Sequence, residues 1–249
     1  MSATELYNRP SADFDAKVAR SIALLKEVAA SHSKLTQASS LGVEDMVVTH
    51  LIHLAQIASG IFVLDTGKLH PETLAMVEKI EKRYTRSVEV YRPKNESVIK
   101  FVRQNGEKAM FESVELRKGC CDIRKMEPLA RALAGHDGWI TGLRREQSNA
   151  RAEVAEVMQE PERIKVNPLV EWTWGDVWHF VATQQLEYNA LHDQFYPSIG
   201  CEPCTRAISM GEDFRAGRWW WEQESAKECG LHVQAIEPLR NAIEEKSPS

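Results

Sequence analysis

The five cysteines of this 249-residue chain are the first candidates for metal binding and nucleophilic chemistry. Cys120 and Cys121 are adjacent, Cys201 and Cys204 form a C-x-x-C pair, and Cys229 stands alone near the C-terminus. The number of cysteines is odd, and the N-terminus lacks the charged and then apolar pattern of a secretion signal. Together these features indicate a reducing compartment. We therefore expect a four-cysteine metal centre, one further thiol and a cytoplasmic location.

Four sulfur ligands are typical of either a zinc ion or an iron-sulfur cluster. Most structural zinc sites use two C-x-x-C knuckles, whereas adjacent thiolates can bind different irons of one cluster. The cysteine doublet therefore favours an iron-sulfur cluster. A protein-bound structural zinc ion stays open as the alternative.

Small and polar residues follow two segments that are predicted to be strands. The first is the SSLGVED segment, in which Ser39, Ser40, Gly42 and Asp45 precede or begin a predicted helix. Backbone N–H groups at a helix N-terminus can bind phosphate. The second is LDTG, which covers residues 64–67 and ends the next apolar run. These two turns are candidates for a ligand site, and the first of them for the binding of a phosphate.

Arginines are the candidates for the anionic part of such a ligand. The chain has a formal net charge of -5, which argues against nucleic-acid binding and membrane-surface binding because both need a basic face. An anion must therefore be held by a local group of arginines, whose guanidinium groups bind phosphate and sulfate oxygens bidentately. Four arginines near predicted strand ends or in the DFRAGRWWWE segment are candidates: Arg144, Arg151, Arg215 and Arg218.

Alternating strands and helices must position these groups. Hydrophobic periodicity predicts helices over residues 14–28, 44–58, 71–83, 121–133 and 172–184, and strands over residues 35–38, 61–67, 87–93 and 138–144. Such alternation predicts an α/β fold with a doubly wound, mostly parallel sheet, in which ligands lie at the carboxyl ends of the strands. We expect one domain over residues 1–225 and a mobile C-terminal arm over 226–249. No apolar run is long enough to span a bilayer.

Several segments together resemble the adenylyl-sulfate (APS) reductases of bacterial sulfate assimilation. They are KGCCDIRKMEPLARAL, GCEPC, GRWWWE and KECGLH, and the resemblance runs from about residue 39 to residue 232. It implies the adenine nucleotide alpha hydrolase-like fold, with SSLGVED as a variant of the modified phosphate loop. Leu41 stands where the family commonly has serine, so Ser39, Ser40 and backbone groups are expected to make the phosphate contacts.

The resemblance also assigns roles to individual residues. It implies a 4Fe-4S cluster held by Cys120, Cys121, Cys201 and Cys204. It implies that Lys125, Arg215 and Arg218 assist catalysis by Cys229. The implied substrate-binding residues are Ser39, Ser40, Gly42, Asp45, Leu64, Asp65, Thr66, Gly67, Arg144, Arg151 and His232.

The lone cysteine is the expected nucleophile. By the resemblance, the Cys229 thiolate attacks the sulfate sulfur of APS and expels AMP, which leaves an S-sulfocysteine. With the other four cysteines as ligands, no thiol of this chain remains to release sulfite, so an external dithiol protein is needed, and the family uses thioredoxin. The family also suggests a homo-oligomer.

Three other functions remain open on the sequence. A phosphoadenylyl-sulfate (PAPS) reductase, or an enzyme that takes both substrates, performs the same displacement, although PAPS reductases typically lack the cluster cysteines. Enzymes of the same superfamily that adenylate their substrates usually carry a fuller SGGxDS loop. The last alternative is a zinc-stabilised nucleotide-binding protein without catalysis.

Overall fold

A six-stranded sheet organises the chain, in the order β3-β2-β1-β4-β6-β5. The computed structural model describes residues 2–148 and 151–223. All neighbouring strands are parallel except β5 and β6, which form an antiparallel hairpin at one edge. The strands are β1 (Leu35–Ser39), β2 (Gly60–Leu64), β3 (Glu89–Tyr91), β4 (Gly138–Ile140), β5 (Val157–Gln159) and β6 (Ile164–Val166). The predicted doubly wound, mostly parallel α/β fold is thereby confirmed.

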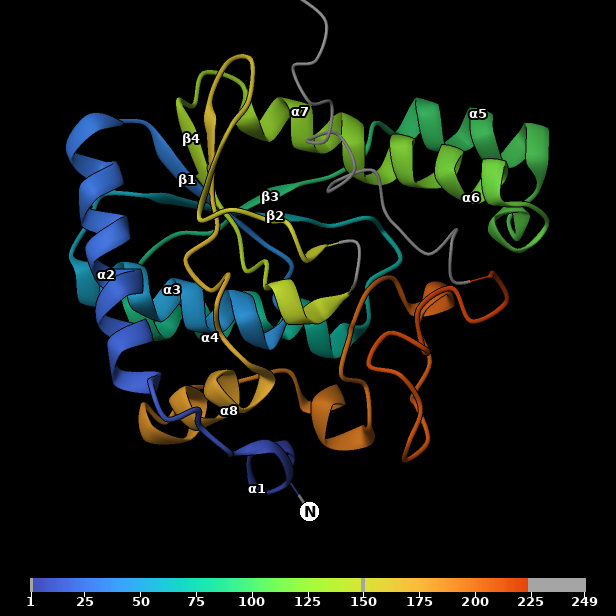
Figure 1. Ribbon diagram of the computed structural model, residues 1–249. Helices are drawn as coiled ribbons and strands as arrows, with labels where there is room; N and C mark the ends of the chain where they lie inside the picture. Colours follow the sequence, from blue (N-terminus) through green and yellow to red (C-terminus); the bar gives the residue numbers. More distant parts are fainter. Residues whose placement is uncertain (1, 149–150, 224–249) are drawn as a thin grey trace, which may run out of the picture.

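Helices cover both faces of this sheet (Figure 1). One face carries α2 (Phe14–Ser31), α3 (Val43–Ala55) and α4 (Pro71–Tyr84), with α8 (Trp174–Thr183) packed outside α3 and α1 (Ala3–Tyr7) beyond it. The other face carries α5 (Asn95–Asn105), α6 (Val114–Cys121) and α7 (Glu127–Leu133). This arrangement follows from the right-handed crossovers between parallel strands, because the chain moves toward one edge of the sheet up to β3 and then returns to β4 on the other side of β1.

The alternation of side chains along β2 shows how both faces are buried. Ile61 and Val63 point to the cluster that includes Met76 and Ile80 of α4. Phe62 points the other way, into a cluster with α7 and β4. Successive side chains of a strand point to opposite faces, so a strand covered on both sides is apolar throughout.

The helix that carries the cysteine doublet differs from its prediction. A single helix was expected over residues 121–133, but the structure has α6 ending at Cys121, a π-helical turn over Asp122–Met126, and then α7. Pro128 lies in the first turn of α7 and has no N–H to donate to the preceding turn, which explains why the regular helix does not continue through it. The wider turn changes the direction of the side chains that it carries, including Lys125.

The remaining differences lie in segments that have weak periodicity. The helices α2, α3, α4 and α8 and the strands β1 to β4 were predicted, with ends that shift by a few residues. The β5–β6 hairpin and α5 were not predicted. The apolar runs of β5 and β6 are short, and pairing with the neighbouring strands selects their conformation. In contrast, α5 has no buried residue and contacts the π-helical turn over Asp122–Met126.

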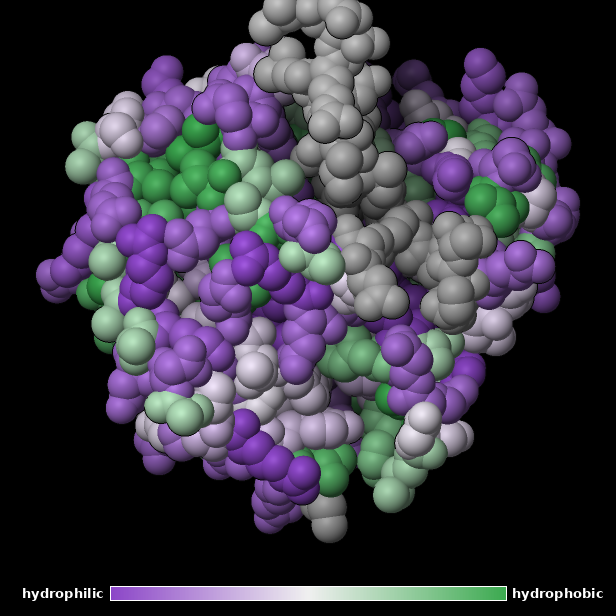
Figure 2. Space-filling model, viewed as in Figure 1, coloured by the Kyte–Doolittle hydropathy of each residue, from purple (hydrophilic) through white to green (hydrophobic). Residues whose placement is uncertain are grey.

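None of the helices in the described ranges is long and apolar enough to cross a membrane. On the face drawn in Figure 2 the surface is mostly hydrophilic, with hydrophobic groups beside one end of α2 and over the segment that follows α8.

A buried ion pair ties the cysteine helix to the last described segment. The Arg117 guanidinium donates to both carboxylate oxygens of Glu222, at 2.9 and 2.7 Å, and the two side chains are 1% and 3% exposed. The same guanidinium lies 4.6 Å from the ring centroid of Trp219. Glu222 is therefore fixed against α6.

We expect Glu222→Gln to lower the free energy of unfolding by about 3–5 kcal/mol, because it leaves the Arg117 charge buried without its counterion. Denaturant unfolding of the anaerobic protein measures this. Arg20 and Glu156 form a matched pair with the same two-bond geometry, at 3.1 and 2.6 Å, but their side chains are 48% and 33% exposed. Glu156→Gln should cost at most about 1 kcal/mol. Equal losses in the two variants would show that burial does not strengthen the Arg117–Glu222 pair.

Candidate active site

A cavity of about 220 Å³ opens where the chain reverses its direction across the sheet. The strand order turns back between β1 and β4, and the polar residues that directly follow these strands, Ser40 and Thr141, line the cavity. The carboxyl ends of parallel strands diverge at such a switch point, and ligands bind in the crevice that this creates. The expected location of the nucleotide site is thus matched by a cavity.

The SSLGVED turn forms one wall of the cavity through a network of its own hydrogen bonds. Ser39 Oγ accepts from the Leu41 N–H at 3.2 Å, and Ser40 Oγ accepts from the Gly42 N–H at 3.3 Å. Ser40 also donates from its backbone N–H and its hydroxyl to Asp45 Oδ2, both at 2.6 Å. Gly42 is the N-cap of α3, so the turn leads into a helix N-terminus, as expected.

The position of Leu41 explains why it can differ from serine. Its backbone has φ of 63°, a left-handed conformation, and its fully buried side chain belongs to the cluster that packs against α4. Leu41 therefore supports the turn from behind and does not line the cavity, whereas its neighbours Ser39, Ser40 and Gly42 do. The strained φ is held in place by the core packing of the side chain.

Asp45 lines the cavity as a buried carboxyl group. Burial raises its pKa to about 6, although the two hydrogen bonds from Ser40 oppose this shift. Gly142 approaches so closely that a Cβ at this position would lie 2.6 Å from Asp45 Oδ1. Glycine after β4 thus permits the close approach of this strand end to the first turn of α3.

The LDTG turn connects the cavity with the second cysteine pair. Leu64 and Thr66 line the cavity, and Thr66 Oγ1 lies 3.2 Å from Cys201 Sγ. Asp65 and Gly67 do not line it. Asp65 binds Arg92 at 2.9 Å and accepts from the Gly67 N–H at 3.0 Å, and Gly67 has φ of 68°. The structure therefore places Asp65 and Gly67 as residues that shape the turn.

Four cationic side chains line the cavity and supply the local positive charge that the acidic chain requires: Lys125, Arg151, Arg215 and Arg218. The three arginines are 8–9% exposed. Arg218 is held by long hydrogen bonds to Ser198 Oγ at 3.3 Å and to the Ile199 carbonyl at 3.4 Å, and its Nε has no partner among the described residues. It keeps capacity to bind an anion.

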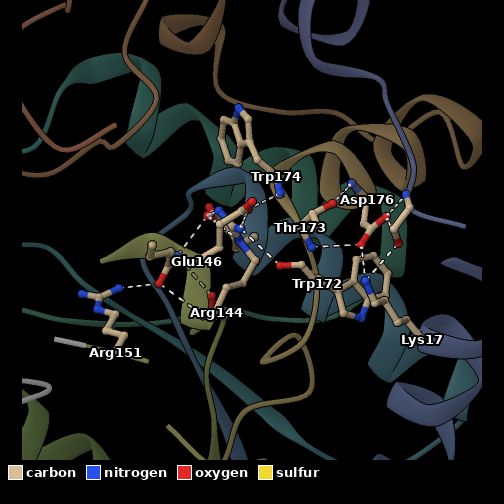
Figure 3. Close-up of polar contacts among 12 residues, drawn as sticks. Lys17, Arg144, Glu146, Arg151, Trp172, Thr173, Trp174 and Asp176 are labelled. Atoms are coloured by element: carbon tan, nitrogen blue, oxygen red, sulfur yellow. Dashed lines mark hydrogen bonds and ion pairs between the residues drawn. The ribbon is translucent and has the colours of Figure 1, made fainter. Parts of the chain in front are cut away.

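Arg144 was predicted to bind substrate, but its side chain does not line the cavity. It is 1% exposed and donates to Glu44 at 3.1 Å, to Glu146 at 2.8 Å and to the Trp172 carbonyl at 3.3 Å (Figure 3). Its guanidinium also lies over the Trp174 ring, 5.3 Å from the centroid. Arg144 therefore supports the wall of the cavity through these contacts and does not face the cavity.

The four predicted ligand cysteines surround one small space next to the cavity. Cys120, Cys201 and Cys204 are buried, and Cys121 is partly buried. Burial raises the pKa of the Cys120 thiol and raises that of Cys204 to about 12, while nearby cations partly oppose both shifts. A thiol with such a raised pKa stays protonated near neutral pH when no metal is bound. It becomes a thiolate when a metal replaces the proton.

This donor set fits an iron-sulfur cluster. Buried thiols with no other chemical task, next to Arg117, Arg124 and Lys125, offer soft ligands together with cations that balance thiolate charge. Among the described residues no three His, Cys, Asp or Glu side chains are grouped around one point as a single metal ion requires.

Lys125 and Trp219 belong to both compartments. Lys125 lines the nucleotide cavity and the space between the cysteines. Trp219 lines the cavity, packs in the cysteine cluster and has φ of 43°. Its ring lies 4.7 Å from the Arg218 guanidinium carbon. A change in the charge or position of the cysteines can therefore alter the positions of Lys125 and Arg218 through direct contacts.

The cavity also contains residues that sequence reasoning missed. They are Glu44, Gln147 and His192, together with the apolar Phe214. Burial lowers the pKa of His192 to about 4, so this imidazole is neutral near neutral pH, and neither ring nitrogen has a partner among the described residues. Glu44 lies within the SSLGVED segment and Gln147 follows the predicted strand over residues 138–144, but neither was predicted to contact the ligand.

Cys229 and His232, and with them the expected arm over residues 226–249, lie outside the described residues. Their assignment as nucleophile and substrate ligand stays a prediction.

The fold and the cavity define an α/β protein with a doubly wound, mostly parallel sheet and a cavity at the switch point of the strand order. Similar folds occur in a PAPS reductase from Candida auris (TM-score 0.64, 24% identity, 80% of this chain and 98% of that chain) and in yeast FAD synthetase (TM-score 0.54, 11% identity, 82% and 73%). At these identities the likeness concerns the fold alone.

The sequence comparison is more specific. The family model described as the phosphoadenosine phosphosulfate reductase domain matches residues 34–207. Two relatives named adenosine 5′-phosphosulfate reductase are 51% identical (Burkholderia cepacia, 90% of each chain) and 46% identical (Allochromatium vinosum, 88% of this chain and 87% of that one). The chain belongs to the phosphoadenosine phosphosulfate reductase family.

Proposed function

We propose that this chain reduces adenosine 5′-phosphosulfate to sulfite and AMP, with thioredoxin as the reductant. The observation that carries the proposal is the contact between a cation-lined nucleotide cavity and a four-cysteine compartment, shared through Lys125 and Trp219. The names of the relatives from Burkholderia cepacia and Allochromatium vinosum, which match about nine tenths of the chain, support the same substrate.

The cavity offers a distinct environment to each part of this substrate. Apolar residues at the ends of β1 and β2, such as Ala38 and Leu64, offer a surface for adenine. The turn at the N-terminus of α3 offers backbone N–H groups to a phosphate. Arg151, Arg215, Arg218 and Lys125 balance the charge of the phosphosulfate.

In the first chemical step the Cys229 thiolate attacks the sulfate sulfur. An S–S bond forms, the bond between sulfur and the phosphate oxygen breaks, and AMP leaves with the electron pair. Lys125, Arg215 and Arg218 stabilise the negative charge that develops on the departing phosphate oxygen. The product on the enzyme is S-sulfocysteine.

In the second step an external dithiol protein attacks the Cys229 sulfur and releases sulfite. The resulting mixed disulfide is resolved by the second thiol of the same partner, which restores the Cys229 thiol. Two electrons thus pass from the dithiol to the sulfur that leaves as sulfite. We assign this role to thioredoxin and place the reaction in the reducing cytoplasm.

Cys120, Cys121, Cys201 and Cys204 are the residues that would hold a 4Fe-4S cluster. When bound, the cluster supplies a fixed charge and a rigid frame next to Lys125. The protein residues around it, Arg117, Arg124 and Lys68, lie where they can balance thiolate charge. We assign the cluster a structural and electrostatic role and no role in electron transfer.

A second candidate is the reduction of PAPS, alone or besides APS. The observation that favours it is the match of residues 34–207 to the family model described as the phosphoadenosine phosphosulfate reductase domain. The four cysteines favour APS, because PAPS reductases typically lack them.

Sulfite release from both substrates tests the proposal. We expect anaerobically purified protein to be brown and to release sulfite from APS in a thioredoxin-dependent reaction, with kcat/KM for PAPS lower by at least about tenfold. The visible spectrum and the metal content are recorded on the same sample. Colourless, zinc-containing protein without turnover would contradict the proposed function, and faster turnover of PAPS would select the second candidate.

A further inference from the structure

The side-chain amide of Gln147 lies between three charged residues on the cavity wall. Its Oε1 accepts hydrogen bonds from a guanidinium N–H of Arg151 and from the backbone N–H of Arg144, the latter at 3.2 Å. Its Nε2 donates to Glu44 Oε1 at 2.9 Å. Because donors face one end of the amide and a carboxylate faces the other, the network fixes the orientation of this amide.

Glu44 is a negative charge in a cavity that must hold an anion, and Arg144 balances it. The Arg144 guanidinium donates to Glu44 Oε1 from Nε at 3.3 Å and from Nη2 at 3.1 Å. Arg144 is held in turn by Glu146 and by the aromatic ring of Trp174 (Figure 3). Glu44 is therefore charge-balanced and immobile, which makes it a firm anchor for the Gln147 amide.

The backbone holds the other end of Gln147. Arg145–Gln147 form a short 3-10 helix directly after the strand end at β4, and the Arg145 N–H donates to the Val170 carbonyl at 3.1 Å. An amide that is anchored through the backbone of the neighbouring Arg145 and through Glu44 presents its oxygen to Arg151 in a fixed direction. A long arginine side chain loses conformational entropy when it is ordered, and an anchored acceptor orders it before the ligand arrives.

We propose that Gln147 is a positioning residue, which holds the Arg151 guanidinium in the direction of the cavity so that it can bind the phosphosulfate group. This inference rests on the proposed function, because Arg151 acts on the substrate only if the cavity takes an anion. Glutamine is the side chain that fits: glutamate would set a second carboxylate against Glu44, and asparagine is one methylene too short to span Glu44 and Arg151.

A double-mutant cycle between Gln147 and Arg151 tests the proposal. Gln147→Met keeps the length of the side chain and removes the acceptor and the donor. We expect it to lower kcat/KM for APS by about tenfold, the effect of one hydrogen bond to a charged group. In the Arg151→Ala background the same change should have an effect of less than about twofold, because a residue that acts through Arg151 has nothing left to position.

The matched control is Gln104→Met, which makes the same chemical change on an exposed position of α5 and should alter neither kcat/KM nor the melting temperature. An equal loss for Gln147→Met in both backgrounds would overturn the proposal, since it would indicate a structural role or a direct contact. A single variant with wild-type kcat/KM would overturn it as well.

Gln147→Asn provides a second variant, should the methionine variant fail to fold. It keeps a polar amide but shortens it, so the same loss and the same dependence on Arg151 are expected. Wild-type protein that neither binds nor turns over APS would contradict the proposed function itself. Wild-type turnover that Arg151→Ala lowers and Gln147 variants do not would remove this inference alone.

Discussion

Cys229→Ser is expected to abolish sulfite release, with a loss on the order of 10⁴-fold or more in kcat. A serine hydroxyl is a far weaker nucleophile than a thiolate near neutral pH, and it cannot form the S–S bond of the intermediate. Thioredoxin-dependent sulfite release from APS measures the loss. Mass spectrometry of the wild-type protein, incubated with APS and no reductant, should show one added sulfonate group that the variant lacks.

The same variant should keep everything that does not depend on this thiol. AMP should bind with an unchanged dissociation constant, because the cations that line the cavity are intact. The iron content and the visible spectrum should equal those of the wild type. Turnover within a few-fold of the wild type, or a sulfonate group on another cysteine, would rule out Cys229 as the nucleophile.

Cys201→Ser is expected to lower the iron content, which Cys229→Ser should leave unchanged. Its thiol is buried beside Thr66 Oγ1, and a hydroxyl is a much poorer ligand for iron than a thiolate. We expect the iron content to fall from about four per chain to nearly none, with loss of the brown colour. Sulfite release should fall by at least about 100-fold, because Lys125 and Trp219 share walls with both compartments.

The two serine variants control for each other, since the substitution is identical and only its place differs. Iron analysis, zinc analysis and the visible spectrum of both proteins are compared after anaerobic purification. Iron that is retained in Cys201→Ser would exclude this thiol as a ligand. Zinc in place of iron in the wild type would select the structural zinc ion that the cysteine spacing leaves open.

Much of the fold could be predicted because its signals are local. The periodicity of α2, α3, α4 and α8 and the apolar runs of the first strands depend only on neighbouring residues. The order of alternation then implied a parallel sheet with its site at the carboxyl ends of the strands. The hairpin of β5 and β6 was missed because neither strand gives an apolar run: β5 is a partly exposed edge strand, and Lys165 interrupts the apolar residues of β6.

The structure brings some of the predicted substrate-binding residues to the cavity and not others. Ser39, Ser40, Leu64 and Arg151 line the cavity as expected. Arg144 does not, although it follows a strand as a ligand would. An arginine near a strand end can face the cavity or a buried carboxylate, and only the position of Glu44, one hundred residues earlier in the chain, decides between them.

By itself, the sequence determined the residue types of the candidate site: four cysteines in two pairs, a fifth cysteine apart from them, and enough arginines to bind an anion in an acidic chain. It also determined that β-α alternation would bring strand ends together. The tertiary structure alone decided that Leu41 turns into the core, that Gln147 joins Glu44 to Arg151, and that Lys125 and Trp219 adjoin both compartments. The physical reason is that periodicity records only which face of an element is buried. Contacts between residues far apart in the chain depend on strand order and on the packing of helices against the sheet.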